Sequence, residues 1–143
     1  MTKKYPAKVS YGLLSLIFVI FFAPLLLDLI NEGFHVNSLG ILIPLLLIFG
    51  LVVHLFLKTE YSIDENVLKI KCGFFTYPAV QIDDIREITH SSTLLSSPAP
   101  SFDRIEIKYG KFESIVLSPK AKFEFATHLT QINPNIKNHL SKK

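Results

Sequence analysis

The chain has 143 residues, a formal net charge of +3 and a hydrophobic fraction of 49%, which is high for a soluble protein. Its length suits about one domain. Four lysines flank the two most apolar stretches, and residues 59–143 carry eleven basic and ten acidic residues. This balance argues against a nucleic-acid partner, because such a surface needs basic charge clustered on one face of a folded domain.

Two stretches, residues 12–27 and 39–57, contain no charged residue. A helix of about 20 residues crosses a bilayer core of ~30 Å, and unpaired backbone groups are too costly in lipid for any other single-segment structure. We therefore predict a membrane hairpin within residues 1–58, with helices at about 10–30 and 39–57. Pro24 and Pro44 are compatible with this, since membrane helices tolerate proline.

A basic start followed by an apolar run also describes a secretory signal peptide. The run is longer than a signal core, however, and "LLLDLINEG" lacks the small-x-small cleavage pattern. The flanking lysines, Lys3, Lys4, Lys8 and Lys58, lie before the first span or after the second, while the connector carries acidic residues and no Lys or Arg. The positive-inside rule then predicts that both termini are cytoplasmic.

From Thr59 onward, short runs rich in β-branched and aromatic residues alternate with turn signals. Residues 64–66 and 110–111 are typical of tight hairpin turns. We expect six or seven mostly antiparallel strands, formed by "TEYSI", "VLKIK", "FFTYPAVQI", "IREITHSS", "RIEIKY" and "FESIVLS".

The last part of the chain has helical periodicity. The Ser118-Pro119 pair predicts a helix start, with serine as N-cap and proline in the first turn. An apolar stripe then follows, and residues 133–134 (Asn-Pro) predict the end. The stripe consists of Phe125, Leu129 and Ile132. Residues 59–143 are therefore expected to form a bent, mainly-β domain closed by a C-terminal α-helix, with one small core.

The sequence offers little for catalysis or metal binding. Cys72, the only cysteine, alternates with Leu68 and Ile70 and is expected to be a core residue. His90 and His128 lack metal-ligand spacing, and there is no G-x-S-x-G elbow or phosphate-binding glycine loop. We predict no metal, no cofactor and no enzymatic activity. His54, near the end of the second span, is a candidate for a hydrogen bond between the helices.

The segment "SSPAPS" allows two interpretations. Its prolines favour a stiff, extended strap, which either sets the register of the strand at 104–109 or presents an exposed apolar and basic patch to a partner. Pre-ordered segments lose little entropy on binding, which favours such contact surfaces. The hypothetical partner-binding residues are Leu94, Leu95, Ser97, Pro98, Pro100 and Arg104.

Three blocks carry a family resemblance. "EYSIDENVLKIKCG", "SPAPSFDRIEIKYG" and "IVLSP" before a helix ending "INPNI" resemble the bacterial pleckstrin-homology-like (PH-like) family of small membrane-attached proteins, which is broadly similar to the sublancin immunity protein. The resemblance implies a PH-like barrel or sandwich with a C-terminal α-helix, attached to the bacterial cytoplasmic (inner) membrane.

Fold alone does not define function. We expect a membrane-anchored, non-enzymatic protein whose cytoplasmic domain binds a protein or peptide partner; bacteriocin immunity or envelope-stress protection is the alternative. Phospholipid headgroup binding is less favoured, because the first hairpin has only Lys69 and Lys71 where lipid-binding PH domains have a basic cluster. With Lys58, these lysines are candidate headgroup contacts, each contributing about 1 kcal/mol near an anionic surface.

Overall fold

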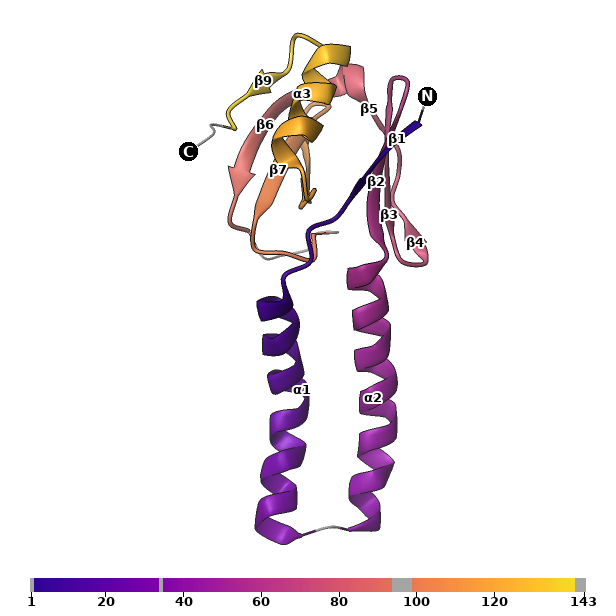
Figure 1. The fold of residues 1–143 in the computed structure, drawn as a ribbon, viewed down its shortest axis with the longest axis vertical. Helices are drawn as coiled ribbons and strands as arrows, with labels where there is room; N and C mark the ends of the chain where they lie inside the picture. The colour runs from indigo at the N-terminus through magenta and orange to yellow at the C-terminus, as the bar shows by residue number, and fades with distance from the viewer. Residues whose placement is uncertain (1, 34, 94–98, 141–143) are drawn as a thin grey trace.

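The computed structural model describes residues 2–33, 35–93 and 99–140. Two long helices, α1 (Tyr11–Glu32) and α2 (Val36–Leu57), run side by side away from a β-rich domain (Figure 1). Each helix has 22 residues, or about 33 Å at 1.5 Å per residue. Both are long and apolar enough to cross a membrane, with a mean hydropathy of 2.7. The second helix begins three residues earlier than its sequence indicates.

The β-rich domain contains two sheets that do not close into a barrel. The first has the order β1 (Thr2–Pro6), β2 (Thr59–Asp64), β3 (Val67–Cys72) and β4 (Phe75–Thr76), and β5 (Val80–Gln81) also pairs with β3. A single 3-10 turn, η1 (Ile82–Asp84), leads to the second sheet. That sheet has the order β8 (Glu113–Leu117), β7 (Arg104–Tyr109), β6 (Ile85–Ser91) and β9 (Lys137–Asn138). All pairs are antiparallel except β6 with β9.

The strand β1 was not expected from the sequence. It pairs with β2 from Thr2 opposite Asp64 to Pro6 opposite Glu60, so the chain before α1 and the chain after α2 lie next to each other in one sheet. Within β1 only Tyr5 is buried, and this single inward side chain gives no alternating pattern. The lysines that indicate membrane topology also bind the domain, because Lys3 pairs with Glu124 at 2.7 Å.

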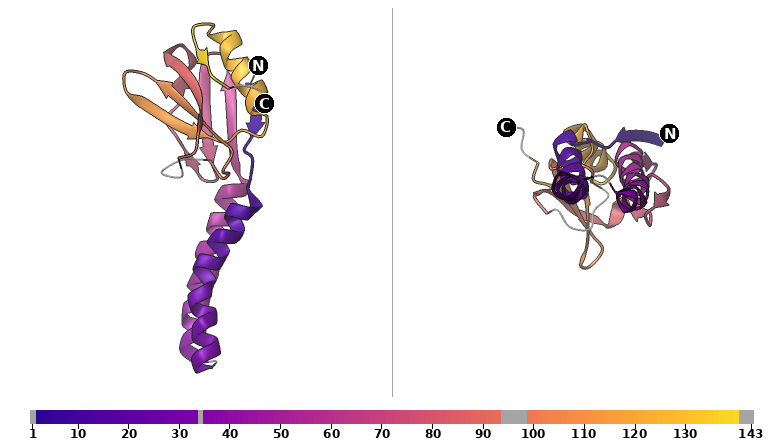
Figure 2. Two further views of the ribbon diagram at one scale, coloured as in Figure 1. Left: turned by 90° about the vertical axis from the view of Figure 1, so that its left-hand side faces the viewer. Right: turned by 90° about the horizontal axis from the view of Figure 1, so that it is seen from below.

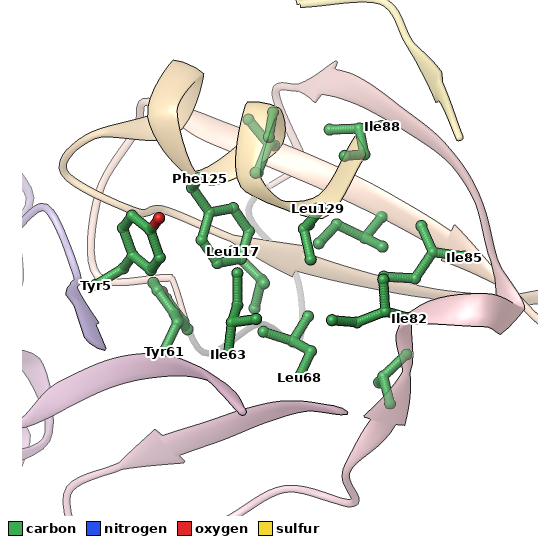
Figure 3. Packing of buried hydrophobic residues seen from close by; sticks show 14 of the residues in the cluster. Tyr5, Tyr61, Ile63, Leu68, Ile82, Ile85, Ile88, Leu117, Phe125 and Leu129 are labelled. Atoms are coloured by element: carbon green, nitrogen blue, oxygen red, sulfur yellow. The ribbon is translucent and has the colours of Figure 1, made fainter. Parts of the chain in front are cut away.

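The core lies between the sheets and under the last long helix, α3 (Lys122–Ile132). Figure 3 shows Phe125 and Leu129 of α3 reaching down to side chains of β2, β3 and β8. The Tyr5 ring meets Phe125 edge-on, with 5.1 Å between centroids. The core residues with no exposed surface are Tyr61, Leu68, Ile70, Ile82, Ile88, Ile105, Ile107, Leu117, Phe125, Ala126 and Leu129.

The predicted apolar stripe and end of α3 are confirmed, but its predicted start is wrong. The helix begins at Lys122 after Ala121, and Ser118 is not its N-cap. Instead Ser118 is fully buried and Pro119 forms a β-bridge with Ala7. Pairing with the segment after β1 therefore takes up the residues that locally resemble a helix start.

Replacing Tyr61 by Phe tests the buried contact beneath Ser118. The Ser118 N–H donates to the Tyr61 hydroxyl at 3.1 Å in the core. Removing this acceptor is expected to lower the free energy of unfolding by about 1–3 kcal/mol, because a buried amide loses its partner. Denaturant unfolding of the detergent-solubilised chain measures this, with exposed Tyr11→Phe as control; equal stability of both variants would contradict it.

The same tyrosine predicts a dependence on alkaline pH. Burial raises the pKa of Tyr61 to about 12 from an ordinary value of 10.0. Because the buried hydroxyl ionises at a higher pH than the hydroxyl of the unfolded chain, the stabilising contribution of Tyr61 is fully present below pH 10 and is lost as the pH rises towards 12. The loss in unfolding free energy is about 3 kcal/mol at most. Unfolding measured between pH 9 and 12 should therefore show the stability gap between wild type and Tyr61→Phe narrowing. Parallel curves would argue against it.

Candidate functional site

The junction of α2 with the domain is direct. Only Lys58 separates the end of α2 from β2; its N–H donates to the His54 carbonyl at 3.0 Å, and its carbonyl accepts from the Gly73 N–H at 3.1 Å. The Thr59 hydroxyl donates to the Leu55 carbonyl at 2.6 Å. Because strand and turn residues satisfy groups that a helix end leaves unpaired, α2 enters the sheet without a flexible linker.

The turn between β3 and β4 packs against the last turn of α2. Gly73 has a φ of +58°, and a Cβ there would lie 2.6 Å from Leu55 Cδ2. Only glycine fits this backbone and this close approach without strain. The next residue, Phe74, stacks on the His54 ring with 4.4 Å between centroids. The contact that the structure shows for the His54 ring is therefore with the domain, whereas the sequence suggested a bond between the helices.

A hollow of about 560 Å³ lies at this junction, and two of the three predicted headgroup lysines line it. Phe74 and Phe75 beside it are 73% and 62% exposed. The lining residues are Pro6, His54, Leu57, Lys58, Thr59, Glu60, Lys71, Gly73 and Phe74. Exposed aromatic rings and ammonium groups thus gather where the domain meets α2.

The third predicted lysine, Lys69, is not among the residues that line this hollow. It lies on the same exposed face of β3 as Lys71, two residues earlier and so about 7 Å away along the strand at 3.3 Å per residue, and it pairs with Asp64 at 2.8 Å. The Lys69 hydrogen bond lowers the pKa of Asp64. Lys58 and Lys71 therefore line the hollow together, whereas Lys69 lies beside Lys71 on the strand and is paired with Asp64.

The described part of the "SSPAPS" segment supports the start of α1. The Ser10 N–H donates to the Pro100 carbonyl at 2.9 Å, and the Ser10 hydroxyl accepts from the Leu13 N–H at 3.4 Å as N-cap. Pro100 is buried, which matches the structural interpretation of this segment. The other expected partner-binding residues, Leu94, Leu95, Ser97 and Pro98, lie outside the described residues.

Arg104 is buried, whereas the sequence predicted an exposed side chain in a basic patch. It is 5% exposed, and its guanidinium donates to the backbone carbonyls of Ser101 and, at 2.8 Å, Thr93. Thr93 follows β6 and Ser101 precedes β7, so Arg104 connects the chain after β6 to the chain before β7. A charged group satisfied in this way joins these two segments and does not present itself to a partner.

Asp103 connects the segment just before β7 to two other parts of the chain. Its carboxylate pairs with Lys8, just before α1, at 2.9 Å and with Lys122 of α3 at 2.6 Å. Partial burial would raise the pKa of Asp103, but the two ammonium groups outweigh it and lower the pKa. The α1 side of the junction is therefore held by ion pairs as well as by the Ser10 cap.

A second site with an exposed aromatic side chain lies away from the helices. Phe112 is 96% exposed at the tip of the β7–β8 hairpin, which projects from the side of the domain in Figure 2. The Gly110 N–H beside it donates to the Asp84 carbonyl, and nearby Ile82 donates to Asn66 at the tip of the β2–β3 hairpin. Phe112 thus lies towards the end of the domain opposite the helices.

A shallow groove of about 380 Å³ runs along the outer face of the second sheet beside Phe112. Lys108 pairs with Glu87 at 3.0 Å and lowers its pKa, and His139 contacts the same carboxylate at 3.2 Å. In the described part of the chain, Arg86 and Lys111 form no ion pair. The groove is lined by Arg86, Glu87, Glu106, Lys108, Tyr109, Gly110, Lys111, Phe112, Glu113 and Ser114.

Sequence reasoning missed both aromatic sites. The sequence pattern predicted Phe74 and Phe75 as the start of the strand "FFTYPAVQI" and Phe112 as the start of the strand "FESIVLS". The available signal was a large aromatic residue directly after a turn glycine, at Gly73 and near Gly110. Among the described residues, no group of three or more His, Cys, Asp or Glu side chains could hold a metal ion.

The fold and the comparison with known families agree. A sequence model described as bacterial PH domain matches residues 59–133, from the start of β2 to the residue after α3. The match covers just over half of the chain, which therefore belongs to the bacterial PH domain family. No curated protein and no solved structure matches the chain. The matched region excludes α1 and α2, so the family defines the domain and not the hairpin.

Replacing Gly73 by Ala tests the close packing of the turn on α2. The new Cβ would meet Leu55, in a backbone conformation that L residues rarely adopt, so we expect a loss of about 2–3 kcal/mol in unfolding free energy. Gly110→Ala is the matched control, because it has the same φ of +58° but meets only the movable end of Glu113. Its expected cost is about 1 kcal/mol. Equal losses in denaturant unfolding would show that packing on α2 contributes nothing.

Proposed function

We propose that this bacterial PH domain is a membrane-anchored, non-enzymatic binding module that holds a protein or peptide partner at the cytoplasmic face of the bacterial inner membrane. The partner contacts the β7–β8 hairpin and the groove beside it. PH-like domains are generally non-catalytic, which supports the non-enzymatic assignment. The bacteriocin-immunity alternative rests on the family resemblance alone.

The exposure of Phe112 carries this proposal. A ring that is 96% exposed at the end of the domain opposite the helices cannot be covered by the bilayer that those helices would cross. Aromatic and arginine side chains supply most of the binding energy in protein interfaces. Phe112 has Arg86 and Lys111 in the same groove, so a partner there can bury the ring and pair with the cations.

The anchoring and orientation rest on α1 and α2. Their 22-residue lengths match a bilayer, and Lys8 and Lys58 lie at the two helix ends that face the domain. The connecting segment at the other end has no Lys or Arg. The positive-inside rule therefore supports a cytoplasmic domain.

Site-specific photocrosslinking in native membranes tests the site. A photoreactive phenylalanine analogue at position 112 is expected to give one discrete crosslinked protein. The same analogue at Gln131, exposed on α3, is the control and should not give it. The same product from both positions, or none from position 112, would contradict the proposed surface.

Replacing Phe112 by Ala then measures the contribution of the ring. Capture of the protein crosslinked at position 112 should weaken about tenfold or more, as expected for an aromatic anchor worth about 1.4 kcal/mol or above. The midpoint of unfolding should stay unchanged, because the side chain makes few contacts within the domain. If Phe112→Ala captured the crosslinked protein as well as wild type, with unchanged stability, Phe112 would not be part of the interface.

A further inference from the structure

Two adjacent exposed aromatic residues, Phe74 in the β3–β4 turn and Phe75 at the start of β4, lie beside the end of α2. We propose that Phe74 and Phe75 insert into the headgroup layer of the bilayer that α2 crosses, so that the domain contacts the membrane directly as well as through its helices. This inference depends on α1 and α2 crossing a bilayer. It does not depend on a partner at Phe112.

The depth at which Phe74 would lie in the bilayer follows from its contact with His54. Their rings stack at 4.4 Å, and His54 lies three residues before the end of α2, which is about 4.5 Å along the helix axis. The helix, at about 33 Å, is only slightly longer than a ~30 Å hydrocarbon core. A side chain beside the last turn of α2 therefore lies at the boundary between hydrocarbon and headgroups.

The chemistry of the turn suits that boundary. Aromatic side chains are enriched there, and Phe74 and Phe75 keep most of their surface free of protein contacts. Lys58 and Lys71 line the adjoining hollow and can reach anionic headgroups. The glycine that precedes the aromatic pair, Gly73, allows the turn to lie against the helix.

The start of α1 also has exposed aromatic side chains beside it. Tyr11, the first residue of α1, is 72% exposed. Phe102 is 49% exposed and follows Pro100, whose carbonyl binds Ser10 at the N-cap. Exposed aromatic residues thus lie at both places where the hairpin meets the domain, as in the aromatic belts of membrane proteins. This continuity with the two apolar helices identifies lipid as the occupant of the surface.

Tryptophan fluorescence tests the proposal, because the natural chain contains no tryptophan. Phe75→Trp, Phe74→Trp, Phe112→Trp and Phe18→Trp each introduce one fluorophore into the full chain, reconstituted in phosphatidylcholine and phosphatidylglycerol vesicles. Lipids brominated near the headgroup end of the acyl chains serve as quencher. Phe18→Trp, inside α1, reports on the hairpin, and Phe112→Trp is the control for an exposed ring away from the helices.

We expect bromolipid to reduce the Phe75→Trp and Phe74→Trp emission at least twofold, with a shift to shorter wavelength, while Phe112→Trp stays unquenched. Phe75→Trp emission as unquenched as that of Phe112→Trp would overturn the proposal. A shift to shorter wavelength without bromolipid quenching would also overturn it, because protein and not lipid would then cover the ring. If bromolipid did not quench Phe18→Trp, α1 would not lie in the bilayer, and the premise that the helices cross a membrane would be wrong.

Discussion

The backbone pairing of β1 with β2 is the contact on which the rest of the molecule depends. In the sequence, β1 precedes the two helices and β2 follows them. Because the two strands pair in one sheet, α1 and α2 form a long insertion between adjacent strands. The pairing also brings Tyr5 into the core, where its ring meets Phe125 and its hydroxyl lies 3.1 Å from His128 Nδ1. Hairpin and domain therefore form one structural unit rather than a domain on a tether.

Much of the fold could be predicted because its signals are local. Two uncharged apolar stretches identify the helices, and alternation identifies β2, β3 and β7. The parts that were missed depend on contacts between distant segments. β1 has one buried side chain, and its lysines already had an explanation in membrane topology. The Ser118-Pro119 pair resembles a helix start, yet a bridge to Ala7 and the Tyr61 hydroxyl hold it in extended structure.

The candidate sites were harder to predict, since exposure is a property of the folded chain. Alternation assigns Arg104 to an outer face, but the carbonyls of Ser101 and Thr93 draw its guanidinium inward. Of the three candidate lysines, Lys58 and Lys71 line the hollow beside α2, whereas Lys69, on the same face of β3 as Lys71, is paired with Asp64. Phe74 becomes a surface residue only because Gly73 turns the chain against α2.

The position of β1 makes completion of the first sheet depend on the path of the two helices between β1 and β2. During synthesis β1 is made first, but its partner β2 follows only after both helices. In the proposed topology, in which both helices cross a bilayer, the two strands would meet only once the second helix has brought the chain back to the side on which β1 lies. A chain that inserted one helix and not the other would keep β1 and β2 apart, lose Tyr5 from the core and leave the edge of β2 open. In that topology, completion of the sheet would act as a check on correct insertion.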